Sequence, residues 1–237
     1  MFNNAVIFAA GMSSRMNYSS KAMKIVAGKP LITYALDALF ENGIKKIFII
    51  YRSDDNEILE LPSLWVHSDI QLVFIEDSLK QGSVKAHRLF ANVVSYPLLT
   101  LDCDIIIHSL SLTKAIQDCT VLFSNPEVKA AVAVVDNPIF KGSKTLRLLG
   151  DRVIAHSNLG FSDGKEGGYI FAWRNSLVSV IDKYYLKDQK YRTKTSFFSY
   201  YLSKNKVCAM HIDYLWDVDD MDVLSKTEII LKNHILW

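Results

Sequence analysis

A short stretch near the N-terminus combines small residues with basic side chains that suit phosphate binding. It directly follows an apolar run, and Lys21 comes a few residues later. Small residues allow a sharp turn whose amide N–H groups converge on an anion, and the Arg15 guanidinium offers a fixed fork of donors to phosphate oxygens. The stretch predicts a phosphate-binding turn, with an ordinary strand–loop connection as the alternative. Its residues are Ala9, Ala10, Gly11, Met12, Ser13, Ser14 and Arg15.

Paired carboxylates follow another apolar run, at Asp102 and Asp104. In an extended chain, side chains two residues apart face the same side, so we expect these two carboxylates to point together. Neighbouring carboxylates raise each other's pKa unless a cation lies between them, and Mg²⁺ prefers oxygen ligands of this kind. The alternative is that the pair caps a helix beginning near Ser109. This motif alone leaves both interpretations open.

A second acidic run lies near the C-terminus and contains Asp217, Asp219, Asp220 and Asp222. A helix favours acids at its N-cap and in its first turn, which suits Asp220 and Asp222 as the start of a closing helix. Asp217 and Asp219 come earlier, at a predicted strand end, and remain available to a metal. Taken alone, this run favours helix capping over metal binding.

Two glycine-containing stretches stand beside predicted strands. Gly82 and Ser83 separate the strand LVFIE from a helix, where they either cap that helix or contact a base or ribose. Gly167 and Gly168 begin a strand that can lie under a ligand. We expect these stretches to border the same site as the acidic pairs.

Several other classes of site and partner are not expected. The histidines show no HxxxH or HExxH spacing, and there is no GxSxG, P-loop or GxGxxG pattern. A formal net charge of +2 indicates no nucleic-acid partner, and no apolar run reaches the ~20 residues of a membrane span. Three cysteines without paired spacing indicate reduced thiols, and with no secretion signal we expect a cytoplasmic location.

The elements that must position these residues alternate between strands and helices. Apolar strands separated by helices predict an α/β fold with a doubly wound, mostly parallel sheet, in which ligands bind at the carboxyl ends of the strands. A turn-rich region is expected from Asn137 to Gly168. The expected strands cover residues 4–10, 45–51, 70–76, 96–107, 128–136, 168–173 and 206–213, and the expected helices cover residues 30–44, 83–94, 110–119, 176–187, 195–205 and 219–235.

Taken together, the stretches AAGMSSRM, SKAMKIVAGKPLITYALDAL, LDCDIII and WDVDDMDVL resemble the nucleotidyltransferases that make nucleotide-activated sugars and phospho-alcohols. This family includes sugar-phosphate, phosphocholine cytidylyltransferase-like and MobA-like NTP transferases. The resemblance spans nearly the whole chain and is strongest over residues 5–40. The sequence departs from the family pattern at Ser13, Ser20 and Met221, where many members have Gly, Pro and Pro.

The resemblance implies a Rossmann-like, GT-A-like fold of three layers with a small acceptor-binding lobe. A single domain would span 1–237, with about 1–135 binding nucleotide and about 136–237 binding the acceptor and forming the closing helix. It also implies that residues 9–14 wrap the nucleotide phosphates, that Arg15 and Lys21 are catalytic, and that Gly82 and Ser83 lie near the base. One aspartate of each pair would bind Mg²⁺, and the strand after Gly167 would line the acceptor pocket.

The expected reaction couples an NTP, with CTP favoured, to a phosphate monoester and releases pyrophosphate. The acceptor would be a phospho-alcohol or a sugar phosphate, and the product a precursor of cell-surface polysaccharide or lipid. The alternatives are a GT-A-like glycosyltransferase with a nucleotide-sugar donor and a non-catalytic nucleotide-binding protein. Tyr169, Trp173 and Trp216 either stack on a cationic headgroup or form core and pocket wall. The sequence leaves the oligomeric state, including homo-oligomerisation, open.

Overall fold

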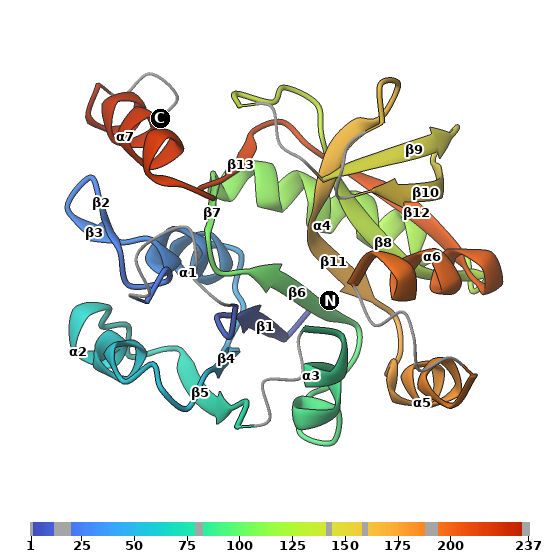
Figure 1. Cartoon of the computed structure of the whole chain (residues 1–237), viewed down its shortest axis with the longest axis horizontal. Helices are drawn as coiled ribbons and strands as arrows, with labels where there is room; N and C mark the ends of the chain where they lie inside the picture. The colour runs from blue at the N-terminus through green and yellow to red at the C-terminus, as the bar shows by residue number, and fades with distance from the viewer. Residues whose placement is uncertain are drawn as a thin grey trace.

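The computed structural model describes residues 2–11, 20–78, 83–140, 144–157, 161–187 and 194–233. Its centre is a nine-stranded sheet in the order β5-β4-β1-β6-β11-β8-β12-β10-β9 (Figure 1). The strands of this sheet are β1 Asn4–Phe8, β4 Lys46–Tyr51, β5 Gln71–Glu76, β6 Leu98–Asp102, β8 Val128–Val135, β9 Thr145–Leu149, β10 Arg152–Ser157, β11 Lys165–Trp173 and β12 Lys206–Ile212.

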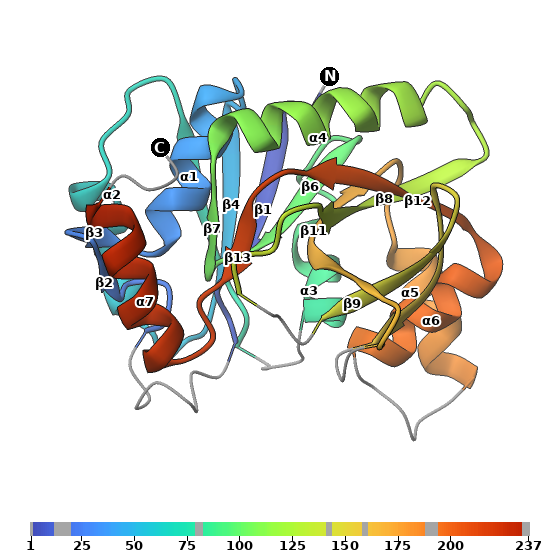
Figure 2. The same cartoon turned by 90° about the horizontal axis from the view of Figure 1, so that it is seen from above.

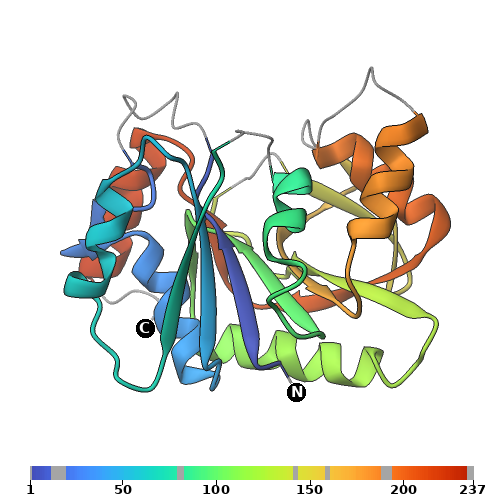
Figure 3. The same ribbon diagram turned by 90° about the horizontal axis from the view of Figure 1, so that it is seen from below.

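Helices cover both faces of this sheet, which confirms the α/β fold class. The helices are α1 Ile32–Glu41, α2 Leu61–Leu64, α3 Ser83–Phe90, α4 Ser109–Leu122, α5 Val178–Lys187, α6 Lys194–Lys204 and α7 Met221–Lys232, with a 3₁₀ turn at Glu57–Glu60. Figure 3 shows α2 and α7 at one end of the molecule and α5 and α6 at the other. No helix among the described residues is both long and apolar enough to cross a membrane.

The first half of the sheet, from β5 through β4 and β1 to β6, is entirely parallel. Successive residues of β1 point to opposite faces, so Ala5 and Ile7 pack in the core that includes α1 and α4, while Val6 packs with Phe90 of α3. Both faces of β1, β4 and β6 are therefore buried, which explains their mainly apolar sequences, whereas the edge strand β5 is only partly buried. We call this part the parallel half.

The second half, from β11 to β9, mixes both orientations. β11 runs antiparallel to β6 and to β8, whereas β12 runs parallel to β8, and β10 runs antiparallel to β12 and β9. Side chains of α5 and α6 pack with those of β8 and β11 in a separate core. In Figure 2, α4 runs along the sheet across both halves. We call this part the mixed half.

The structure corrects two expectations about individual elements. The region expected to be turn-rich, Asn137 to Gly168, contains the hairpin β9–β10, whose strands are joined through Gly150 at φ +57°. The strand expected over 96–107 is broken: β6 ends at Asp102, a turn follows, and β7 covers Ile105–Ile107. β7 leaves the main sheet and pairs antiparallel with β13, Leu215–Asp217.

The small elements complete the frame around the carboxyl ends of the parallel strands. β2 (Ile25–Val26) and β3 (Lys29–Pro30) form a short hairpin before α1.

The predicted end of α1 is confirmed, because Gly43 adopts φ +74° and its N–H donates to the carbonyl of Phe40. The three cysteines are buried free thiols.

Candidate active site

A crevice opens at the carboxyl ends of β1 and β6, where ligands bind in α/β sheets of this kind. The space within it, including the part open to solvent, is about 840 Å³, and the crevice lies between the two acidic stretches and the chain after β1. The structure therefore brings together residues that are far apart in the sequence. The lining residues are Phe8, Ala9, Ala10, Gly11, Lys21, Ser83, Asp102, Cys103, Asp104 and Asp219.

Three carboxylates form the acidic centre of this crevice. One oxygen each from Asp104, Asp217 and Asp219 lies within 4.8 Å of the others. Asp102 does not belong to this group. The expectation of one extended strand through Asp102 and Asp104 is wrong, because Asp102 ends β6 and Asp104 lies in the turn that follows, although both side chains line the crevice.

Pairing between β7 and β13 explains why the two acidic stretches meet. Asp217 is in register with Ile105, and the N–H of Val218 donates to the carbonyl of Asp104 at 2.8 Å. Trp216 and Val218 are buried in a core beneath α7. Because side chains alternate along a strand, Asp217 then points away from that core toward Asp104. A short two-stranded ladder thus assembles the carboxylates.

Of the two acidic stretches, the second caps a helix and the first does not. The Asp220 side chain accepts from the N–H of Val223 at 2.9 Å and caps α7, with Asp222 in the first turn, as predicted. At α4 the cap is His108, whose Nδ1 accepts from the N–H of Leu110 at 3.1 Å. Asp102 and Asp104 therefore do not cap α4.

Lys21 binds the acidic group from the side of the crevice. Its Nζ lies 2.5 Å from Asp104 Oδ2 and 2.9 Å from Asp219 Oδ1. Burial favours the neutral amine, but the carboxylates of Asp104, Asp217 and Asp219 outweigh it and raise the pKa of Lys21 above its ordinary value. Lys21 is therefore charged at neutral pH and already lies where an anionic ligand would need a cation.

A second lysine, Lys144, was not identified from the sequence. Its Nζ lies 2.9 Å from Asp102 Oδ2, 3.5 Å from Asp217 Oδ2 and 4.3 Å from the centroid of the Tyr169 ring. Burial opposes its charge, but Asp102, Asp217 and Asp104 raise its pKa well above the ordinary lysine value. No motif surrounds Lys144, so only the fold shows that it reaches the site.

The acidic group has the properties of a site for a hard divalent cation. Asp104 Oδ1 and Asp217 Oδ1 are buried and have no hydrogen-bond partner among the described residues, and an unpartnered carboxylate oxygen is costly to bury. Burial, followed by the charge of Asp104, raises the pKa of Asp217 well above its usual range. Lys21 has the opposite effect on Asp219 and lowers its pKa despite burial. Three oxygen donors with two unpartnered atoms fit Mg²⁺.

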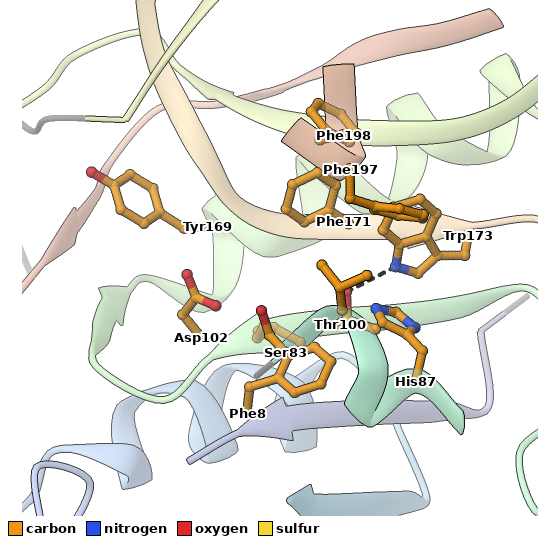
Figure 4. A pocket seen from close by; sticks show the side chains of 12 residues that line it. Phe8, Ser83, His87, Thr100, Asp102, Tyr169, Phe171, Trp173, Phe197 and Phe198 are labelled. Carbon is orange, nitrogen blue, oxygen red and sulfur yellow. Dashed lines mark hydrogen bonds between the residues drawn. The ribbon is translucent and has the colours of Figure 1, made fainter. Parts of the chain in front are cut away.

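A second, narrower cavity of about 400 Å³ adjoins the crevice and is mainly aromatic (Figure 4). Aromatic side chains of β11 and α6 face Phe8, Ser83 and His87 across it. Trp173 Nε1 donates to Thr100 Oγ1 at 2.9 Å. The lining residues are Phe8, Ser83, Val84, His87, Thr100, Leu101, Asp102, Tyr169, Phe171, Trp173, Phe197 and Phe198, of which Phe8, Ser83 and Asp102 also line the crevice.

The predicted glycines of β11 serve the packing of the strand itself. A Cβ at Gly167 would lie 2.2 Å from the carbonyl oxygen of Ala133 in β8, and Gly168 adopts φ +92°. The following residues Tyr169 and Trp173 line the aromatic cavity, whereas Trp216 is core and donates to Thr227. The predicted pocket wall is thus present, but Trp216 is not part of it.

Ser83, the first residue of α3, lines both the crevice and the cavity. The remaining predicted residues, Met12, Ser13, Ser14, Arg15 and Gly82, lie outside the described residues.

Comparison with known proteins agrees with this geometry. The sequence model of one protein family, the MobA-like NTP transferase domain, matches residues 5–196 of the 237-residue chain. The chain belongs to this family. None of the curated proteins searched matches it in sequence.

Solved structures share the fold of this NTP transferase at low sequence identity. The inositol-1-phosphate CTP transferase from T. maritima has 13% identity and a TM-score of 0.73, over 96% of each chain. The UDP-glucose pyrophosphorylase from Acinetobacter baumannii has 14% identity and a TM-score of 0.74, over 100% of this chain and 99% of that one. A putative glucose-1-phosphate thymidylyltransferase from Bacillus anthracis has 16% identity and a TM-score of 0.76, over 97% and 95%.

Proposed function

We propose that this NTP transferase couples a nucleoside triphosphate, with CTP favoured, to a phosphate monoester and releases pyrophosphate. The observation that carries the proposal is the convergence of Asp104, Asp217 and Asp219 with Lys21 at the carboxyl ends of the strands. A triphosphate is strongly anionic, so it requires a cationic site with carboxylates for its metal ion. The crevice beside Ala9, Ala10 and Gly11 supplies both.

In the proposed reaction, an oxygen of the acceptor phosphate attacks the α-phosphorus in line. The new P–O bond forms as the bond to the bridging oxygen of the β-phosphate breaks, and that oxygen leaves with pyrophosphate. A phosphate monoester is largely ionised at neutral pH because its second pKa is about 6, so the protein does not need a general base. Catalysis then depends on positioning and on neutralising charge.

The residues of the crevice divide this work. Asp104, Asp217 and Asp219 would hold one Mg²⁺ ion, and its charge would screen the repulsion between the two phosphates. Lys21 would exchange its carboxylate partners for the α-phosphate and stabilise charge that grows there. Arg15 in the glycine-containing turn would support the departing pyrophosphate, with Gly82 and Ser83 beside the nucleoside.

The wall of the aromatic cavity favours a phospho-alcohol over a sugar phosphate as the acceptor. A buried sugar ring needs a hydrogen-bond partner for each hydroxyl group, because an unpaired hydroxyl is costly to bury. The cavity wall is mainly apolar and aromatic, and the Thr100 hydroxyl already accepts from Trp173. Aromatic faces instead attract a compact cationic headgroup. Such a product would serve as a precursor of cell-surface polysaccharide or lipid.

CTP is the first triphosphate to test because the sequence resembles cytidylyltransferases of similar length. The structural neighbours are named as a CTP transferase, a UDP-glucose pyrophosphorylase and a putative thymidylyltransferase. These names imply different bases, so the base that this chain uses must be determined by assay. Pyrophosphate release with CTP, UTP, ATP and GTP, each paired with phosphocholine, inositol 1-phosphate and glucose 1-phosphate, tests the proposal. We expect release with CTP and phosphocholine, because its choline group is a compact cation without free hydroxyl groups to bury.

The same assay separates the alternatives. A glycosyltransferase would release no pyrophosphate from any triphosphate but would consume a nucleotide sugar. A non-catalytic nucleotide-binding protein would bind a triphosphate in a titration and yet release no pyrophosphate with any acceptor.

A further inference from the structure

Lys144 is a buried cation between the aromatic cavity and the acidic group. It contacts Asp102 and Tyr169, which line the cavity, and Asp217, which belongs to the acidic group. Its side chain nevertheless keeps 19% of its surface exposed. Burying a lysine is expensive, and the two carboxylates it binds come from separate strands.

The two lysines of the site approach the carboxylates from different directions. Lys21 lines the crevice and binds Asp104 and Asp219, whereas Lys144 precedes β9 and binds Asp102 and Asp217. No carboxylate is shared between them in these ion pairs. The proposed reaction brings two phosphates together, one from the nucleotide and one from the acceptor. Each phosphate needs a cation of its own in addition to the shared metal ion.

We propose that Lys144 is a catalytic residue that binds the phosphate of the acceptor. This inference rests on the proposed function and assigns its second substrate a position: the phosphate against Lys144 and the attached alcohol in the aromatic cavity. On binding, the Lys144 ammonium exchanges a carboxylate for a phosphate oxygen. Asp102, which lines both spaces, then marks the boundary across which the phosphate faces the nucleotide.

The position of Lys144 distinguishes this role from that of a simple counter-ion. A residue that only neutralised Asp102 could lie anywhere around that carboxylate. Lys144 instead lies over the face of Tyr169, where the aromatic cavity meets the acidic group. An ammonium in this position can bind a phosphate whose substituent occupies the cavity, because both groups are reached from one point.

The test measures phosphate binding separately from nucleotide binding. Full-length protein is saturated with Mg²⁺ and the non-reactive α,β-methylene analogue of CTP, and inorganic phosphate is then titrated by calorimetry. Loss of a hydrogen bond to a charged group predicts that Lys144→Met weakens phosphate binding by about 10- to 100-fold. Its affinity for the nucleotide analogue should change by less than about twofold.

Lys114→Met is the matched control. Lys114 also binds two carboxylates, of Asp213 and Asp136, but it lies outside the site. This variant should bind both phosphate and the nucleotide analogue as the wild-type protein does.

A second variant keeps the test valid if loss of the ion pair with Asp102 prevents Lys144→Met from folding. Lys144→Met/Asp102→Asn removes one charge of each sign, and Asp102→Asn alone is its reference. The double variant should bind phosphate at least about tenfold more weakly than the single one. Equal phosphate binding by the two, or an equal loss of nucleotide and phosphate affinity, would overturn the role of Lys144. If the wild-type protein binds no triphosphate, the proposed function itself fails.

Discussion

The parallel half and the mixed half of the sheet contribute to the site in different ways. The parallel half supplies Ala9, Ala10 and Gly11 at the end of β1, and a neighbouring segment brings Lys21 onto Asp104. The mixed half supplies the aromatic side chains of β11, and Lys144 lies next to it. A polar crevice thus adjoins an apolar cavity, with Asp102 in the wall of both. Under the proposed function, the nucleotide and the acceptor would therefore be recognised by different chemistry.

The largest expected effect concerns the cation on the crevice side. Lys21→Met should lower kcat by about 10²- to 10³-fold, because removing a group that stabilises transition-state charge typically has this cost. The fold should be retained, which circular dichroism can verify, and Lys114→Met should keep full activity. Turnover near the wild-type rate in Lys21→Met would remove this lysine from the mechanism.

The second prediction concerns the acidic group itself and separates Asp104 from Asp102. Asp104→Asn and Asp217→Asn should weaken Mn²⁺ binding by at least about tenfold, since each removes one of three carboxylate ligands. Asp102→Asn should bind Mn²⁺ nearly as the wild-type protein does. Electron paramagnetic resonance of free Mn²⁺ measures both. A stronger effect at Asp102 than at Asp104 would show that the metal site is elsewhere.

The third prediction concerns the aromatic cavity. Trp173→Leu should raise KM for the acceptor by about 3- to 30-fold, which corresponds to the loss of one cation–π contact. Trp173→Phe retains an aromatic face and should recover most of this loss. Steady-state kinetics should show an unchanged KM for CTP in both variants. An equal rise in both KM values would mean that the cavity does not distinguish the acceptor from the nucleotide.

The smallest expected effect tests whether the second acidic stretch contains separate residues for capping α7 and for binding the metal ion. Asp220→Ala removes the cap of α7 and should lower the free energy of unfolding by about 1 kcal/mol, as measured by urea denaturation. Its affinity for Mn²⁺ should remain unchanged. Asp219→Ala should show the reverse pattern, with weaker Mn²⁺ binding. If Asp220→Ala lost the metal instead, the assignment of these two neighbours would be reversed.

The sequence identified the parts of the site that depend on local patterns. Capping preferences assign Asp220 to the start of α7 and leave Asp217 at the end of the preceding strand, as the structure confirms. The β9–β10 hairpin was not predicted, although the sequence carries a signal for it. Gly150 and Asp151 separate two short runs of alternating character, which is typical of a hairpin with a two-residue turn.

Long-range contacts explain what the sequence could not reveal. The turn between Asp102 and Asp104 exists because β7 leaves the sheet to pair with β13, more than 100 residues later in the chain. No local pattern near Asp102 indicates this pairing. Lys144 likewise has no motif around it, and its proposed role follows only from the carboxylates and the Tyr169 ring that the fold places beside it.

The most direct test of the central claim is a crystal structure with Mg²⁺ and the α,β-methylene analogue of CTP. We predict one metal ion bound by Asp104, Asp217 and Asp219, with the α-phosphate in contact with both this ion and Lys21. A nucleotide bound away from these carboxylates, or a metal ion held by other residues, would contradict the account.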